Sequence, residues 1–444
     1  MVKIKVIDAI CGAGKTSYAI QMINEASRIS KISSENGIEY RTNRKYIYVT
    51  PFLSEVERVV ENTKAEFSEP KSIKGSKMTH LKYLIDEEKS IVMTHQLFSK
   101  IDEDMLGDIE MAGYTLIMDE VANVIEHVNI ESSDVKMLFE SNKIEVLEDN
   151  RVKWLDCSYM VTENSRFKDI KTLADNDNLY LIDNKAMFWT MNVKSFESFK
   201  EVYIMTYLFD GQIQKYYYDY FDVTYSKHSI IFNNDNNKYE LVEYDSKVDK
   251  RENVANLIEI YQDYYNNSGR KVNLNSNYDD FKKESKKKPR YYLSSTWFTK
   301  AEDKNIKQLK NNLESFFRRQ VNCKNNELFW TTKKDFAEDL KNSKCKINKK
   351  DDRTKDNYVA LNARATNEYA DRKATAYVYN RFMHPMEKKF FETRGVKVNE
   401  DLLAVSDLVQ FLFRGCIRKG EVMQCYIPSP RMRALLIDWL NYKI

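Results

Sequence analysis

The sequence predicts an α/β fold in which parallel sheets form two tandem domains. In the first half of the chain, strand-like apolar runs alternate with helical patterns, and the same alternation resumes after a polar stretch in the second half. A glycine-containing loop also joins the first strand to the first helix. A chain of 444 residues is long enough for two domains, each with its own core. We therefore expect two cores with a cleft between them.

The first domain is expected to span residues 1–220. Its strand-like runs are VKIKVID, YIYVTP, IVMTH, YTLIMDE and VYIMTYLF, at residues 2–8, 46–51, 91–95, 114–120 and 202–209. A helical pattern, YAIQMI, follows the first of them. Residues 140–198 interrupt this rhythm, and we interpret them as an insertion in the first domain.

A polar connecting segment is expected at residues 221–289, with one helical period from Asn253 to Tyr265. The second domain then occupies residues 290–444. Its expected strands are at residues 291–298, 328–332, 358–367 and 424–430, and an apolar-periodic helix around residues 433–439 closes the chain.

Composition limits the classes of function. The net charge of +3 is too small for a protein that coats nucleic acid by bulk electrostatics, so any nucleic-acid track must be local. The six cysteines are scattered without a CxxC pair, which favours reduced thiols and no structural zinc. No signal peptide and no apolar run of roughly 18 residues is present, so we expect a cytoplasmic protein without membrane contact.

The strongest chemical signal is AICGAGKTS at residues 9–17, which lies between the first strand and the first helix. It fits a P-loop in which Ala9 replaces the first glycine. Backbone N–H groups of such a loop wrap the β-phosphate, Lys15 reaches the β- and γ-phosphates, and Thr16 holds Mg²⁺. The expected ATP-binding residues are Gly12, Ala13, Gly14, Lys15, Thr16 and Ser17. The alternative is a strand-to-helix turn that binds no ligand.

A second signal is the apolar strand that ends in Asp119 and Glu120. Parallel strands deliver their terminal side chains to the carboxyl edge of the sheet, where the P-loop also lies. Asp119 is then expected to bind Mg²⁺ through water, and Glu120 to polarise the attacking water. Taken alone, such a pair is more often the start of a solvated loop.

These motifs resemble those of superfamily 2 helicases of the DEAD/DEAH-like type. AICGAGKT is similar to their motif I and IMDEVA to their motif II, although Ala122 stands where DEAD and DEAH proteins have Asp or His. Residues 46–58, 93–98 and 202–212 resemble motifs Ia, Ib and III, and residues 362–372 and 410–418 resemble motifs V and VI. Together they resemble the replication-associated helicases of bacteriophages. The fold implied is two RecA-like domains with a central nucleotide cleft.

The resemblance also implies contacts with nucleic acid. The residues implied in strand contact or in coupling to hydrolysis are Thr50, Pro51, Thr94, His95, Thr206, Tyr207, Arg364, Thr366 and Asn367. Contacts of this kind with phosphates position a protein on a nucleic acid without reading the bases. Tyr216, Tyr217, Tyr218 and Trp297 lie among basic residues, where they could stack bases or form a core edge, and the sequence does not decide between the two.

Motif VI also has an argument of its own. Gln410, Arg414 and Arg418 recur every four residues in a helical pattern, which would place them on one helix face. An arginine there would neutralise charge on the transferring phosphoryl group, and we favour Arg414 with Arg418 beside it. Phe413 replaces the glycine that is usual in this motif. The alternative is a solvated basic face.

The sequence thus predicts an ATP-dependent helicase or translocase that uses ATP and Mg²⁺. The nucleic acid on which it moves is expected to be single-stranded, and DNA rather than RNA. We expect the protein to act in phage replication, with replication proteins as partners, in the host cytoplasm. Three alternatives remain: a translocase that does not unwind, a P-loop kinase, and a non-catalytic nucleotide-binding module.

Overall fold

A computed structural model describes residues 3–35, 44–51, 53–73, 75–156, 162, 165–275, 289–341, 357–361 and 368–444. The chain forms two compact units. The first consists of Met1–Asp8, Gly14–Tyr244 and Met383–Val398, and the second of Ala9–Ala13, Asp245–Phe382 and Asn399–Ile444. Residues 383–398 therefore belong with the first unit, although they come late in the chain.

An eight-stranded sheet forms the centre of the first unit, in the order β13-β12-β1-β11-β5-β2-β4-β3. The strands are β1 (Lys3–Asp8), β2 (Tyr46–Thr50), β3 (Phe67–Ser68), β4 (Ser90–Thr94), β5 (Thr115–Asp119), β11 (Glu201–Thr206), β12 (Tyr225–Asn233) and β13 (Lys238–Glu243). Only the β12–β13 pair is antiparallel. All five residues of β2 are buried, as expected of a parallel strand covered on both faces.

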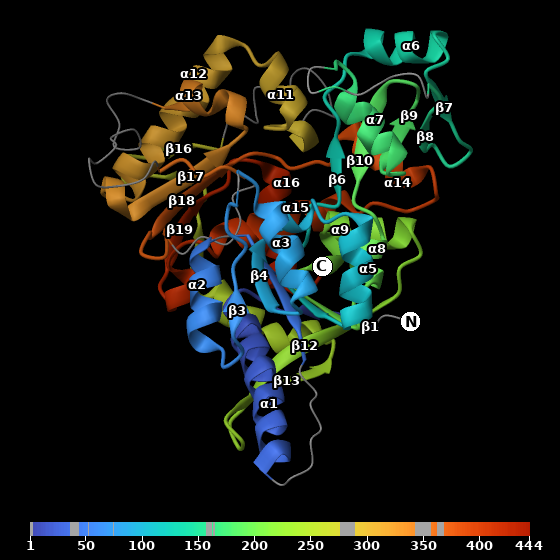
Figure 1. Ribbon diagram of the computed structural model, residues 1–444. Helices are drawn as coiled ribbons and strands as arrows, with labels where there is room; N and C mark the ends of the chain where they lie inside the picture. Colours follow the sequence, from blue (N-terminus) through green and yellow to red (C-terminus); the bar gives the residue numbers. More distant parts are fainter. Residues whose placement is uncertain are drawn as a thin grey trace. The chain divides into compact units, whose positions relative to one another are not determined.

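Helices pack beside this sheet, and α3 and α5 lie side by side in front of its strands (Figure 1). The helices of this unit are α1 (Lys15–Glu35), α2 (Leu53–Asn62), α3 (Lys77–Asp86), α4 (His95–Phe98), α5 (Glu103–Ala112), α8 (Lys194–Glu197), α9 (Ile213–Tyr220) and α14 (Pro385–Glu392). Side chains set two of the helix starts, because Ser76 accepts from the Met78 N–H and Asp102 from the Met105 N–H.

A small subdomain separates β5 from β11 in sequence. It contains β6 (Ile125–His127), α6 (Ser132–Glu140), β7 (Ile144–Val146), β8 (Val152–Trp154), α7 (Lys168–Asp175), β9 (Leu179–Ile182) and β10 (Ala186–Thr190). Its strands form the antiparallel sheet β6-β10-β9 and the hairpin β7-β8. Val135, Leu138, Leu179 and Met187 contribute to a core of its own. The interruption expected at residues 140–198 lies largely within this subdomain.

The second unit has a four-stranded parallel sheet in the order β14-β19-β18-β17. These strands are β14 (Ile258–Ile260), β17 (Leu328–Thr332), β18 (Ala374–Val378) and β19 (Met423–Tyr426), and a hairpin is formed by β15 (Tyr264–Tyr265) and β16 (Lys271–Val272). The helices are α10 (Arg251–Ala255), α11 (Ser295–Lys300), α12 (Asp303–Ser315), α13 (Ala337–Leu340), α15 (Glu400–Leu412) and α16 (Pro430–Leu440). The predicted fold class, α/β with parallel sheets in two tandem domains, is confirmed.

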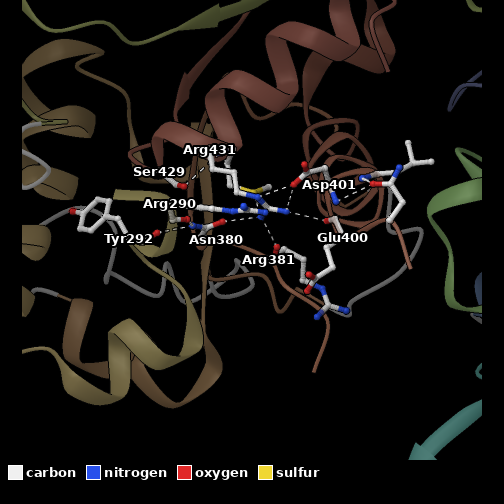
Figure 2. A network of polar contacts seen from close by, with 11 residues as sticks. Arg290, Tyr292, Asn380, Arg381, Glu400, Asp401, Ser429 and Arg431 are labelled. Carbon is white, nitrogen blue, oxygen red and sulfur yellow. Dashed lines mark hydrogen bonds and ion pairs between the residues drawn. The ribbon is translucent and has the colours of Figure 1, made fainter. Parts of the chain in front are cut away.

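Arg431 joins the starts of α15 and α16 to the end of β18 (Figure 2). Its Nη1 donates to Asn380 Oδ1 at 2.9 Å and to the Arg381 carbonyl at 2.7 Å. Its Nη2 donates to the Glu400 carbonyl at 3.0 Å and pairs with Asp401 at 2.6 Å. One buried guanidinium therefore fixes three chain segments at the carboxyl edge of this sheet.

Two local predictions in the second half were wrong. Residues 291–298, expected as a strand, form a turn and then α11, because the Ser294 hydroxyl caps the helix by accepting from the Trp297 N–H at 3.2 Å. The helical period from Asn253 to Tyr265 ends early, since α10 stops at Ala255 and Ile258–Ile260 pairs with β19 instead. Of the expected strand at 358–367, Tyr358 makes an isolated bridge with Trp330, and residues 362–367 lie outside the described residues.

No helix among the described residues combines the length and the apolar character needed to cross a bilayer. The cysteines at 11, 323, 416 and 425 carry free thiols.

Candidate functional site

The carboxyl edge of the large sheet gathers most of the residues that the sequence singled out. Parallel pairing aligns Asp8 with Thr206, Met205 with Asp119, and Thr50 with Thr94. Because β1, β11, β5, β2 and β4 are neighbours, their ends form a continuous edge.

The predicted P-loop, residues 9–17, turns sharply between β1 and α1. Gly12 and Gly14 have φ of +89° and +95°, a region that side chains rarely adopt. The Ala13 N–H donates to the Ile10 carbonyl at 3.1 Å, which closes the turn, and α1 begins at Lys15. Lys15 is 9% exposed. The loop therefore has the strand–turn–helix context that the motif requires.

Tyr239 of β13 covers the last glycine of this loop. A Cβ at Gly14 would collide with the Tyr239 ring. Gln21 of α1 fixes the backbone of Tyr239, since its Nε2 donates to the Tyr239 carbonyl at 3.0 Å and its Oε1 accepts from the Tyr239 N–H at 2.8 Å. The small size of Gly14 thus matters for packing as well as for its φ.

The start of the loop has a second support. The Ile10 N–H donates to Asp249 Oδ1 at 3.1 Å. Asp249 lies 3.8 Å from Arg251, whose Nη1 donates to the carbonyl of Trp439 at 2.9 Å. Within the second unit, this chain of contacts ties residues 9–13 to α16.

Asp119 ends β5 beside the P-loop. Burial, together with the charge of neighbouring Glu120, raises the carboxyl pKa to about 7, and the charge of Lys15 opposes the shift. The His95 Nε2 lies 2.7 Å from the Asp119 carbonyl oxygen. A cation at this carboxylate would stabilise the ionised form that burial and Glu120 disfavour.

Glu120 turns away from the strand with φ of +65°. Its N–H donates to the Met205 carbonyl at 2.9 Å, and its Oε2 accepts from the Thr206 hydroxyl at 3.4 Å. Thr206 is fully buried, so this contact connects the ends of β5 and β11 directly. Two residues further on, the Ala122 N–H donates to Gln214 Oε1 at 2.7 Å.

The donor set fits Mg²⁺. Thr16 and Asp119 offer a hydroxyl and a carboxylate, the oxygen ligands that this ion prefers. Burial raises the pKa of Tyr48, and a hydrogen bond with Thr16 opposes that shift, so Thr16 lies against β2. Thr50 Oγ1 is buried and lacks a hydrogen-bond partner among the described residues, and such an atom is unusual unless a ligand or water satisfies it.

Asp8 fixes the turn that follows β11. Its carboxylate accepts from the Leu208 N–H at 2.7 Å and the Phe209 N–H at 2.9 Å, and Lys227 lies 3.5 Å away. Leu208 has φ of +52°. Burial raises the pKa of Asp8, while Lys227 and the two N–H groups oppose that shift.

The residues expected to contact nucleic acid differ in exposure. Thr50, Thr206 and Tyr207 are buried, whereas Pro51, Thr94 and His95 are partly exposed. Only the second group offers surface to a strand directly. Arg364, Thr366 and Asn367 lie outside the described residues.

Motif VI departs from the predicted single helix face. The helix α15 ends at Leu412, so Gln410 is helical, Arg414 lies in the following turn, and Arg418 belongs to a short 3₁₀ segment. The chain leaves the helix where Gly415 packs so closely against Met423 that no Cβ would fit there. The prediction that Gln410, Arg414 and Arg418 share one helix face is therefore wrong.

The two arginines differ in their surroundings. Arg414 is 5% exposed, its Nη1 donates to the Ala360 carbonyl at 3.4 Å, and burial lowers its pKa to about 10. Cys11 of the P-loop, which belongs to the same unit, is close enough to oppose that pKa shift. Arg418 is exposed, and the Gln410 Nε2 donates to Ser406 Oγ at 3.3 Å.

Of the aromatic residues left open by the sequence, Tyr216, Tyr217 and Tyr218 are buried core residues. Tyr239, Gln214, Asp8 and Asp249 were missed as supports of the site. Asp8 alone carried a local signal, as a carboxylate inside an apolar strand directly before the P-loop.

Comparisons with known proteins identify relatives of this chain. Residues 252–440 match the model of the YonV C-terminal Rossmann-like domain, and residues 125–189 match that of the YonV middle domain. The chain is 35% identical over 456 residues to the SPbeta prophage-derived uncharacterized protein YonV of Bacillus subtilis (strain 168), which covers 99% of both chains.

Among solved structures, the chain is similar to Xpd4 of S. tokodaii, with 10% identity, a TM-score of 0.41, and coverage of 98% of this chain and 94% of that chain. It is also similar to an apo XPD, with 13% identity, a TM-score of 0.39, and coverage of 96% and 92%.

Proposed function

This chain belongs to the YonV family, and we propose that it is an ATP-dependent helicase or translocase that couples ATP hydrolysis to movement on nucleic acid. The observation that carries the proposal is the shared edge of β1, β11 and β5, where Lys15, Thr206 and the Asp119–Glu120 pair lie close together. These are the parts that P-loop ATP hydrolysis requires.

Each residue of this edge has a distinct role in the proposal. The P-loop N–H groups and Lys15 would bind the phosphates of ATP, while Thr16 and Asp119 would hold Mg²⁺. Bound Mg²⁺ would supply charge neutralisation at the phosphates. Glu120 would orient the attacking water and accept its proton.

The contact between Thr206 and Glu120 supports a coupling role for the motif III segment. A shift of β11 relative to β5 would change the hydrogen bond to the carboxylate that orients water. The rate of ATP hydrolysis would then depend on the packing around Thr206 and Tyr207. Among the motif VI arginines, buried Arg414 is the better candidate to neutralise charge on the phosphoryl group, because it lies near Cys11 of the P-loop.

We propose a single-stranded nucleic-acid track, DNA rather than RNA. The prophage origin of the Bacillus subtilis relative supports a role in phage replication, with replication proteins as partners and the host cytoplasm as the site of action.

ATP turnover tests the proposal. It should be measured for the wild type, Lys15→Ala and the control Lys82→Ala, an exposed lysine of α3, each with and without single-stranded DNA, single-stranded RNA and duplex. We expect nucleic acid to stimulate turnover in the wild type and in Lys82→Ala, and Lys15→Ala to abolish it. Turnover that depends on Lys15 but ignores every nucleic acid would contradict the motor and favour the kinase alternative. A strand-displacement assay then separates unwinding from translocation on intact duplex.

A further inference from the structure

A cavity of about 460 Å³ lies where the small subdomain meets the large sheet within the first unit. The sheet side of its wall includes His95 and Gln96, and the subdomain side includes Glu126, Leu173 and Trp189, with Asn123 between them. The volume is within the roughly 300–1,000 Å³ that small-ligand sites occupy.

Trp189 provides a flat apolar wall. The other four residues of β10 are buried, whereas Trp189, which lines the cavity, is partly exposed. It shares a strand face with Met187, a core residue, and Leu173 packs at the edge of the same core. The indole of Trp189 thus lies at the edge of the subdomain core and forms part of the cavity wall.

The polar part of the wall offers both donors and acceptors. Asn123 Nδ2 donates to the Glu126 carboxylate, which has further acceptor capacity. The lining includes no Lys or Arg among the residues that the structure describes, so it does not suit a phosphate. An aromatic plane with amide, imidazole and carboxylate groups around it suits a neutral planar heterocycle.

We propose that this cavity binds one base of a single-stranded nucleic acid, which stacks on Trp189 and is hydrogen-bonded at its edge by Asn123 and Glu126. The inference rests on the proposed function, because it names where the track is held. A carboxylate acceptor favours bases that carry an exocyclic amino group.

The cavity is also connected to the ATP site. His95 contributes to its wall and lies 2.7 Å from the Asp119 carbonyl oxygen through its Nε2. Asn123 and Glu126 follow Asp119 and Glu120 closely in the chain. A base that displaces His95 or Asn123 would therefore move the backbone of the motif II segment, which gives the track a direct route to hydrolysis.

The test compares strand binding by the wild type, Trp189→Phe, Trp189→Ala and the control Tyr83→Ala, which removes an exposed aromatic ring from α3. The probes are a labelled single-stranded oligodeoxynucleotide of mixed sequence and the same backbone built from abasic sites. We expect Trp189→Ala to weaken binding of the base-bearing strand roughly 5- to 150-fold, the range of one stacking contact. Trp189→Phe should restore most of the affinity, and Tyr83→Ala should bind like the wild type.

On the abasic strand, the wild type and Trp189→Ala should bind equally. Equal affinity of these two proteins for the base-bearing strand, or an equal loss on both strands, would overturn the proposal. If Trp189→Ala does not fold, indole fluorescence decides: the base-bearing strand should quench the wild type more than Trp189→Phe, and equal quenching would refute stacking. ATP turnover distinguishes failure of the base site from failure of the proposed motor function. If the strand concentration that gives half-maximal stimulation is the same in every variant, the base site is refuted and the motor function stands.

Discussion

The phenol ring of Tyr239 packs directly on Gly14, leaving no space for a Cβ at this P-loop position. The two residues are far apart in the sequence of the first unit, and Gln21 holds the backbone of Tyr239 in place. The contact makes the β12–β13 hairpin part of the wall that fixes the loop.

Replacing Gly14 by alanine should therefore be more damaging than replacing Gly12. Both positions have positive φ, which costs about 1–2 kcal/mol for a residue with a Cβ, but only Gly14→Ala also displaces the Tyr239 ring. Gly107→Ala in α5 is the control, because it meets open space and should stabilise by about 0.5–1 kcal/mol. Thermal unfolding and ATP binding measure both effects. The double variant Gly14→Ala/Tyr239→Ala should recover part of the loss, and no recovery would contradict the steric explanation.

Asp119 should make stability depend on pH in a defined direction. Its pKa is raised from 3.8 to about 7, so between these values the folded state binds more protons than the unfolded state, and the stability contributed by this group falls as pH rises. Asp119→Asn should consequently be more stable than the wild type at pH 8, with a difference that shrinks as pH falls through about 7. Urea unfolding at several pH values measures this, and a constant difference from pH 8 to 5 would refute it. The variant should also lose the stabilisation that Mg²⁺-ATP gives the wild type.

Removing the Asp8 carboxylate should destabilise the first unit. Asp8→Ala leaves the Leu208 and Phe209 N–H groups without their acceptor and deprives Lys227 of a buried partner, at a cost of about 3–5 kcal/mol. Asp210→Ala is a matched control, because Asp210 also pairs with Lys227, at 2.6 Å, but is 46% exposed. Its loss should cost less than about 1 kcal/mol. Similar free energies of unfolding for the two variants would contradict this account.

Removing Arg431 should destabilise the second unit about as much as removing Asp8 destabilises the first. Arg431→Ala removes a guanidinium that is 8% exposed and leaves the acceptors around it unpaired, so we expect a loss of about 3–5 kcal/mol (Figure 2). Arg431→Lys should recover little, since one ammonium cannot reproduce the planar fork. The exposed Lys373–Glu421 pair provides the comparison, and Lys373→Ala should change stability by less than about 1 kcal/mol. Chemical denaturation measures all three variants.

Replacing Arg414 and replacing Arg418 should have different effects on ATP hydrolysis. If Arg414 neutralises charge on the phosphoryl group, Arg414→Lys lowers kcat by roughly 10³-fold, and Arg418→Lys, on the exposed surface, has a much smaller effect. The reverse order would assign this role to Arg418. Because Arg414 is buried, circular dichroism and thermal unfolding of Arg414→Lys should accompany the kinetics.

Much of the first unit could be predicted from the sequence. Apolar runs at residues 46–51 and 114–120 predicted β2 and β5, because a parallel strand buried on both faces is apolar along its whole length. The sequence also predicted the strand before residues 9–17 and the helix after them, and the structure has β1 and α1 there. That this loop binds ATP stays a prediction. The helix face in motif VI was predicted wrongly, because the period of four continued past the point where packing of Gly415 against Met423 ends α15.

The sequence by itself therefore determined the α/β class, the strand–turn–helix context of residues 9–17 and the place of Asp119 and Glu120 at the end of a strand, all of which depend on residues close together in the chain. Only the tertiary structure decided that Tyr239 covers Gly14, that Gln214 accepts from the Ala122 N–H, and that Trp189 faces a cavity beside His95. Each of these contacts joins segments far apart in sequence, and which segments meet depends on the order of the strands in the sheet. Hydrophobic periodicity reports which face of an element is buried, but it carries no information about the element that covers it.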